Sequence, residues 1–152
     1  MKIYYREKSG GIEILRCFGI EGRVEIPGMI DGKLVISAAP YAFSSHMDEK
    51  EELKNASLWE VSDGLGFGRE EHVLAGNDVE EIVFPYTLKE IGRYIFYGCG
   101  NLKKLEFSDS LMQIGCGAFT GCHALEKLTV HMRQGKKSGV KEMLGEMCSS
   151  DL

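Results

Sequence analysis

Apolar residues recur along the second half of the chain with the spacing apolar-x-x-apolar-x-apolar. One copy begins at Leu102, the next at Leu125, and an earlier one at Val79. In an extended chain, alternate side chains point to opposite faces, so the last two apolar positions of each copy share one face. Each copy therefore predicts a short strand with one buried face. Because the copies are alike, we expect these strands to lie side by side and parallel.

This spacing is part of a longer internal repeat of 23 residues. Residues 84–106 align with residues 107–129 without a gap, and ten of the 23 positions are identical. Most of these positions hold an apolar residue or glycine, as stacked coils require. We expect Phe96 and Phe119 to stack in the core. We also expect Gly92 and Gly115 to occupy corners where no Cβ fits and where the backbone needs the conformational freedom of glycine.

Two upstream segments match the repeat less closely. Residues 26–46 carry Ile-Pro and Tyr-Ala-Phe where residues 84–106 carry Phe-Pro and Tyr-Ile-Phe, but the corner between them is five residues longer. Gly28 and Gly32 supply the turn geometry of this longer corner. Residues 61–83 place apolar residues on most slots of the repeat, yet Gly68 stands where the next unit has Ile91. This segment is either a degenerate coil or no coil.

The remaining segments predict two caps and an insert. Residues 1–23 contain two strand-like runs joined by Lys-Ser-Gly-Gly, which predicts a β-hairpin over the open edge of the first coil. Residues 48–61 begin with Asp48 and Glu51 in capping-box spacing and predict a short polar helix, inserted between coils near 47–60. Over 132–152, apolar residues at helical spacing predict a helix that caps the last coil. These are Val140, Met143, Leu144 and Met147.

The motif L-x-x-L-x-F-x-x-x-L-x-x-I-G-x-x-A-F-x-G-C, recurring every 23 residues, resembles the BspA-like leucine-rich repeats of bacterial and protist surface proteins. The resemblance covers roughly residues 20–131. It implies an α/β-type repeat solenoid, a short leucine-rich repeat stack with a parallel β-sheet face. We expect one domain over 1–152, with the repeats over 24–131. The resemblance also implies a non-enzymatic module that binds macromolecular partners.

The composition narrows the class of partner. The chain has 19 glycines but three prolines, which favours many tight turns without polyproline character. A net charge of -5 argues against a nucleic-acid partner, and no stretch is apolar enough for a membrane span. Charged residues interrupt the N-terminal run, so no signal peptide is predicted. As written, the sequence predicts a cytoplasmic protein, or a cell-surface or secreted one if a leader was trimmed.

The reactive side chains form no pattern that we assign to catalysis, to a metal or to a cofactor. The four histidines have no neighbouring acid or nucleophile in a catalytic motif. The spacing from Cys116 to Cys122 and His123 is not a usual zinc pattern. Five cysteines, an odd number, favour reduced thiols, with a Cys99 to Cys122 disulfide as the minor alternative. The resemblance implies that these two thiols are buried and satisfy backbone groups of the turn.

The leading functional hypothesis is an interaction module that binds an unknown protein or peptide through the outward face of the parallel sheet. Residues beside the buried apolar positions point away from the core and should form three ladders across neighbouring strands. The first ladder is Glu81, Lys104 and Lys127; the second is Val83, Glu106 and Thr129; the third is Pro85, Ser108 and His131. Their mixture of charged and small groups suits a protein surface better than a phosphate backbone or a lipid surface.

Two alternatives remain open at this point. In one, the sheet is merely solvated, and binding uses an end cap or a homo-oligomer contact. In the other, the chain is an accessory or enzymatic protein with a site under residues 47–78. That second alternative predicts a deep pocket with shifted pKa values near Glu70, Glu71 and His72.

Overall fold

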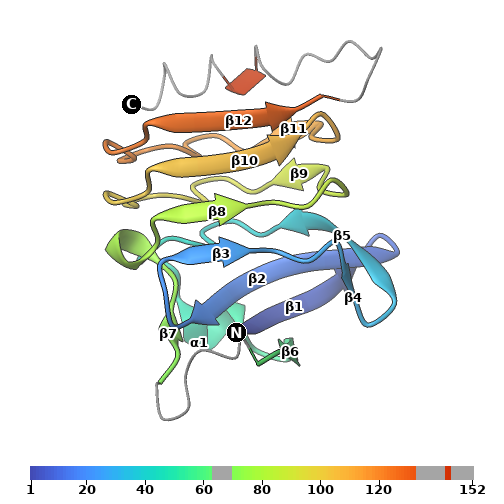
Figure 1. Ribbon diagram of the computed structural model, residues 1–152. Coiled ribbons are helices and arrows are strands. Elements are labelled where there is room, and N and C mark those ends of the chain that lie inside the picture. The colour runs from blue at the N-terminus through green and yellow to red at the C-terminus, as the bar shows by residue number, and fades with distance from the viewer. Residues whose placement is uncertain (63–69, 133–142, 145–152) are drawn as a thin grey trace.

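Successive stretches of the chain stack as coils of a β-solenoid (Figure 1). A computed structural model describes residues 1–62, 70–132 and 143–144. Strands β3 (Arg23–Glu25), β8 (Glu81–Val83), β10 (Lys104–Ser108) and β12 (Lys127–His131) form a parallel sheet in the order β12-β10-β8-β3. Leu105 pairs with Leu128 on one side and with Ile82 on the other. This confirms the predicted parallel sheet and its 23-residue register.

A second sheet lies on the other side of the solenoid (Figure 1). Its parallel part is formed by β5 (Lys33–Ala38), β9 (Glu90–Ile91) and β11 (Gln113–Ile114). The strands β1 (Lys2–Lys8) and β2 (Gly11–Gly19) form the predicted antiparallel hairpin, and β2 pairs with β5 in parallel. The hairpin therefore continues the sheet at its N-terminal end. The short strand β4 (Met29–Ile30) pairs with β5 across the longer corner of the first coil.

The core lies between the two sheets and is built from ladders of equivalent side chains. Phe43, Phe96 and Phe119 are fully buried, and their ring centroids lie 6.1 and 5.5 Å apart from one coil to the next. Phe84 and Phe107 form a second ladder with a centroid distance of 5.0 Å. The predicted stacking of Phe96 on Phe119 is confirmed. Each ring fills the space above its own copy, which gives the repeat its dense core.

The predicted helix over 48–61 is largely wrong. Asp48 does cap a helix, because its side chain accepts a hydrogen bond from the Glu51 amide, but α1 spans only Glu49–Glu52. The helix ends at Glu52 with Leu53 as its C-cap, and Asn55, with a positive φ of 62°, lies in the turn that follows. The following residues form β6 (Ser57–Glu60), which pairs antiparallel with β1. Tertiary pairing with the open edge of the hairpin decides the structure of this segment, over its local helical preference.

The described residues of the segment 61–83, which are 61–62 and 70–83, do not form a separate coil. Strand β8 lies directly beside β3, and β7 (His72–Val73) pairs antiparallel with β2, away from the parallel ladders. The Gly76 amide, at the start of the 3-10 turn η1 (Gly76–Asp78), donates to the Phe43 carbonyl at 2.8 Å, just as the Cys99 amide donates to Phe96 one coil later. The chain therefore leaves the first coil after residue 46 and rejoins it near Leu74.

The predicted C-terminal helix cap over 132–152 lies outside the described residues, apart from 143–144. Leu144 is fully buried in the core, and Met143 packs against the core. The described elements contain little helix, so the helical cap stays a prediction. Among the residues that the structure describes, no helix is long and apolar enough to cross a lipid bilayer.

The two corner glycines are required by sterics and not by backbone conformation. Neither Gly92 nor Gly115 has a left-handed φ, so that part of the prediction is wrong. A Cβ on Gly92 would lie 2.3 Å from the Pro40 nitrogen, and one on Gly115 would lie 2.1 Å from the Arg93 nitrogen. At this corner the backbones of neighbouring coils touch, and no side chain fits between them.

Replacing Phe119 by Ala should lower the free energy of unfolding by about 3–5 kcal/mol, because the fully buried ring leaves a cavity in the ladder. Urea unfolding followed by circular dichroism measures the loss. The matched control is Met112→Ala, since Met112 is 72% exposed and should cost less than about 0.5 kcal/mol. A loss below about 1 kcal/mol for Phe119→Ala would contradict the ladder.

Replacing Gly115 by Ala should destabilise the protein by about 3 kcal/mol or more, since the added methyl group forces two coils apart. Gly28→Ala is the control, because a Cβ there has its nearest neighbour at an ordinary 3.7 Å. Thermal unfolding of the two variants separates the effects. Equal melting temperatures would show that the coils do not approach as closely as described.

Candidate functional site

The outward face of the β3-β8-β10-β12 sheet presents side chains in rows that cross the strands. Lys104 pairs with Glu81 on one neighbouring strand and with Lys127 on the other, and Glu106 lies between Val83 and Thr129. The register of the first two predicted ladders is therefore confirmed. The sequence prediction missed their first members, because β3 adds Arg23 beside Glu81 and Glu25 beside Val83. We call this surface, with Arg23, Glu25 and the two ladders, the sheet face.

The third predicted ladder is only partly formed. Ser108 pairs with His131, but the Ser108 side chain is buried and its hydroxyl donates to the Tyr86 carbonyl at 3.4 Å. Pro85 lies beyond the end of β8. Ser108 is thus the buried last residue of β10 and offers nothing to a partner, whereas His131 remains exposed. The alternation rule fails here because the chain bends at the end of β10, where the Ser110 amide donates to the Ser108 hydroxyl.

Both signs of charge are interleaved on the sheet face. The Arg23 guanidinium lies 3.4 Å from the Glu25 carboxylate and 3.6 Å from that of Glu81. The His131 imidazole lies 3.1 Å from the Glu106 carboxylate. Lys104 and Lys127 lie side by side and are exposed, with no opposite charge between them in the strand register. The face is therefore acidic toward β3 and β8 and more basic toward β12.

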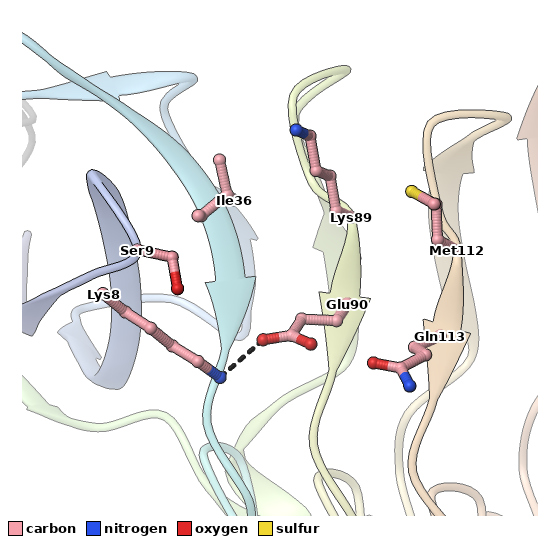
Figure 2. A pocket seen from close by; sticks show the side chains of 7 residues that line it. All are labelled: Lys8, Ser9, Ile36, Lys89, Glu90, Met112 and Gln113. Atoms are coloured by element: carbon pink, nitrogen blue, oxygen red, sulfur yellow. Dashed lines mark hydrogen bonds and ion pairs between the residues drawn. The ribbon is translucent and has the colours of Figure 1, made fainter.

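A cavity of about 430 Å³ lies on the opposite sheet (Figure 2). Its lining residues are Lys8, Ser9, Ile36, Lys89, Glu90, Met112 and Gln113. The Lys8 ammonium binds the Glu90 carboxylate; this hydrogen bond raises the pKa of Lys8 and lowers the pKa of Glu90. Both shifts move away from neutral pH, whereas general acid–base catalysis needs groups that titrate near it. The pair fixes the hairpin to β9 and offers no reactive group.

Cys99 and Cys122 have structural roles in the repeat. The Cys99 thiol donates to the Phe43 carbonyl at 3.1 Å, and the Cys122 thiol donates to the Phe96 carbonyl at 3.3 Å. Both thiols are buried and no disulfide joins them, and burial raises the pKa of the Cys99 thiol and raises that of Cys17 to about 12. Such thiols are poor nucleophiles. Within 1–62, 70–132 and 143–144, no group of three His, Cys, Asp or Glu side chains could hold a metal ion.

The residues proposed for a site under the insert are not gathered around a cavity. One Glu71 oxygen lies 2.6 Å from the Met1 ammonium, and His72 is exposed on β7. A cavity of about 240 Å³ does lie beside the insert, but Glu70, Glu71 and His72 do not line it. Its lining residues are Met1, Gly19, Ile20, Glu21, Arg23, Glu25, Val61 and Leu74. In its described part, the insert extends the sheet of the hairpin through β6 and β7.

Comparison with known proteins assigns the repeat. Residues 70–139 match the family model described as BspA type Leucine rich repeat region (6 copies). Residues 70–139 are a BspA-type leucine-rich repeat region. This confirms the resemblance carried by the 23-residue motif, and the match includes the coils that form β8, β10 and β12.

Two solved structures share the fold of this chain. A leucine rich cell surface protein from Faecalibacterium prausnitzii A2-165 gives a TM-score of 0.55 at 19% identity, over 85% of this chain and 30% of that chain. A leucine-rich repeat protein from Bacteroides capillosus ATCC 29799 gives 0.54 at 17% identity, over 86% and 94%. The chain thus spans 30% of the length of the first. No curated protein matches the sequence.

The first coil of the solenoid has a polar cap that sequence analysis missed. From each coil to the next, the amides of Phe43 and Phe96 donate to the carbonyls of Ile95 and Ala118. The equivalent carbonyl of the first coil, that of Ala42, faces no earlier coil of this kind. The buried guanidinium of Arg16, on β2, takes the place of those amides.

One guanidinium nitrogen of Arg16, Nη1, donates hydrogen bonds to three carbonyls of this corner. It donates to the carbonyls of Tyr41 at 3.2 Å, Ala42 at 3.1 Å and Ser44 at 2.6 Å, while Nε binds the Glu49 carboxylate at 3.0 Å. Burial lowers the pKa of Arg16, and the hydrogen bond that Arg16 donates to Glu49 opposes that shift. The signal in the sequence was a lone arginine inside an apolar strand, Ile-Leu-Arg-Cys-Phe. Such a residue needs buried partners.

Replacing Arg16 by Met should lower the free energy of unfolding by about 3–5 kcal/mol, because it leaves buried carbonyls without donors. The control is Arg23→Met, on the exposed sheet face, where loss of the ion pairs should cost about 0–1 kcal/mol. Urea unfolding of both variants measures the difference. Similar losses for the two variants would refute the capping role of Arg16.

Proposed function

We propose that this chain is a non-enzymatic module that binds a protein or peptide through its sheet face. The observation that carries the proposal is the in-register set of exposed and half-buried side chains across β3, β8, β10 and β12. Parallel strands held by backbone hydrogen bonds place these side chains on a rigid surface, which reduces the ordering cost of binding. The BspA-type repeat supports the proposal, because stacked repeats present extended surfaces of this kind.

The chemistry of the sheet face selects the class of partner. Interleaved Arg23, Glu81 and Lys104 provide charges of both signs, so a nucleic-acid backbone would meet carboxylates as often as cations. A lipid surface would require a broad apolar patch, and Val83 is flanked by Glu25 and Glu106. A protein or peptide with complementary charges of both signs fits the arrangement.

The described residues give more support to a binding role than to an enzymatic one. The Lys8–Glu90 ion pair is held in its charged form, and the buried thiols are held protonated. The relative from Faecalibacterium prausnitzii is described as a cell surface protein, and we propose that location for this chain as an alternative to the cytoplasm.

Exchanging the charges of Lys104 and Glu106, as Lys104→Glu with Glu106→Lys, should leave the melting temperature almost unchanged, because exposed charges contribute about 0–1 kcal/mol. The same change should weaken partner capture at least about tenfold, since it reverses two adjacent charges of the sheet face. Affinity capture from native cell extract, compared by quantitative mass spectrometry with wild type, measures the loss for each captured protein.

The control exchanges an ion pair away from the face, Glu7→Lys with Lys33→Glu, whose partners are similarly exposed. That variant should retain every partner that wild type captures. If the Lys104/Glu106 exchange also retained all partners, while truncation after His131 abolished capture, the contact would lie in the C-terminal segment and the sheet face would be refuted. Analytical ultracentrifugation tests for a dimer. If the wild-type protein self-associates and neither charge exchange disrupts this association, the contact would be an end-cap dimer instead.

A further inference from the structure

A second surface feature lies on the segments that follow β5, β9 and β11, away from the sheet face. Aromatic and hydroxyl side chains from successive coils line a pocket of about 600 Å³. The lining residues are Tyr41, His46, Tyr94, Tyr97 and Thr120, and we call this the tyrosine pocket. None of the sheet-face residues lines it, so it is a separate candidate site.

The rings of the tyrosine pocket form two walls that meet at a steep angle. Tyr41 and Tyr94 are stacked, with ring centroids 5.6 Å apart and planes 20° apart. Tyr97 stands almost perpendicular to Tyr94, at 82° and 5.8 Å. His46 meets Tyr97 edge-on at 4.6 Å. The rings therefore enclose a corner open to solvent, with aromatic surface on both sides.

Two of these rings are carried by residues whose backbone is in an unfavourable, left-handed conformation. Tyr41 and Tyr94 have φ of 60° and 52°, the left-handed region that bulky residues avoid, and Gly117 occupies the same slot one coil later with φ of 65°. Glycine would thus satisfy this corner without strain, yet two coils carry tyrosine. Strain of this kind is typical of functional sites, where a side chain must be held in one position.

The rings are also held in place by their surroundings. A Cβ on Gly117 would lie 2.2 Å from the Tyr94 ring, so the ring occupies the space that a side chain at position 117 would need. At the other end, the Tyr41 carbonyl is bound by the buried Arg16 guanidinium. Both tyrosines are therefore fixed before any ligand arrives, which lowers the entropic cost of binding.

The lining chemistry selects the ligand. Among the described residues of the pocket, none carries a carboxylate, an ammonium or a guanidinium group, so a charged ligand would find no fixed counter-ion. Three phenols and one threonine hydroxyl can each donate and accept a hydrogen bond. A ligand that matches them has an apolar face for the rings and a rim of hydroxyls, which is the chemistry of a neutral sugar. A proline-rich peptide also packs on tyrosines, but it carries almost only hydrogen-bond acceptors and few donors.

We propose that the tyrosine pocket binds a neutral carbohydrate. The sugar ring packs its C–H face on the aromatic wall, and its hydroxyls exchange hydrogen bonds with the phenols, Thr120 and His46. This proposal goes beyond protein binding at the sheet face and does not depend on it.

The purified full chain, probed on an array of neutral and acidic glycans, tests the proposal. Neutral glycans should bind, and titration of the best array glycan should show affinity at least about tenfold weaker for Tyr97→Ala, which removes a whole wall. Tyr97→Phe keeps the ring and removes one hydroxyl, so it guards against misfolding and should weaken binding by about threefold to tenfold. Circular dichroism checks that each variant is folded.

Two controls separate this pocket from other surfaces. Tyr86→Ala removes an exposed tyrosine outside the pocket and should leave glycan affinity unchanged, as should the Lys104/Glu106 exchange. No binding to any neutral glycan, binding to acidic glycans alone, or neutral-glycan binding unaffected by Tyr97→Ala would each overturn the proposal. Binding of a decaproline peptide, lost in Tyr97→Ala and without any glycan bound, would assign the pocket to peptides and overturn it as well.

Discussion

Backbone hydrogen bonds between successive coils set the spacing on which the rest of this structure depends. Parallel strands lie about 4.8 Å apart, so every side chain must fit directly above its own copy in the neighbouring coil. Aromatic rings meet this condition by stacking, as Phe96 does on Phe119, and glycine meets it at the corner where the backbones touch. This condition explains the repeat in the sequence, because each position of the repeat faces the same neighbour in every coil.

The same dependence explains what could be predicted from the sequence. The ladder from Glu81 to Lys127 follows from periodicity alone, since each position sees the same neighbours in every copy. Features that occur once have no such support. Ser57–Glu60 becomes a strand only because β1 offers an open edge, and Arg16 finds its carbonyls only after residues 41–44 have folded beside it. Neither partner lies near in sequence, so local patterns could not reveal them.

The candidate sites divide along the same line. Two of the three predicted ladders form on the sheet face. The third is broken at Ser108, where the strand ends and the serine side chain is buried. The tyrosine pocket could not be predicted, because its two walls depend on ring orientations and on left-handed backbone at Tyr41 and Tyr94. Repetition fixes where side chains lie along the strands, whereas the irregular corners between strands are free to acquire individual chemistry.

Because of the Arg16 cap, the N-terminal end of the solenoid tolerates an added repeat less well than the coils from β8 to β12 do. At the N-terminal end, the guanidinium already occupies the carbonyls that an additional coil would have to engage. A duplicated 23-residue unit therefore has no place to dock between the hairpin and the first coil. Between β8 and β12, by contrast, each coil contacts only its neighbours, and an extra unit would find the same partners as the existing ones. Changes in repeat number, by evolution or by design, are therefore confined to the region beyond the first coil.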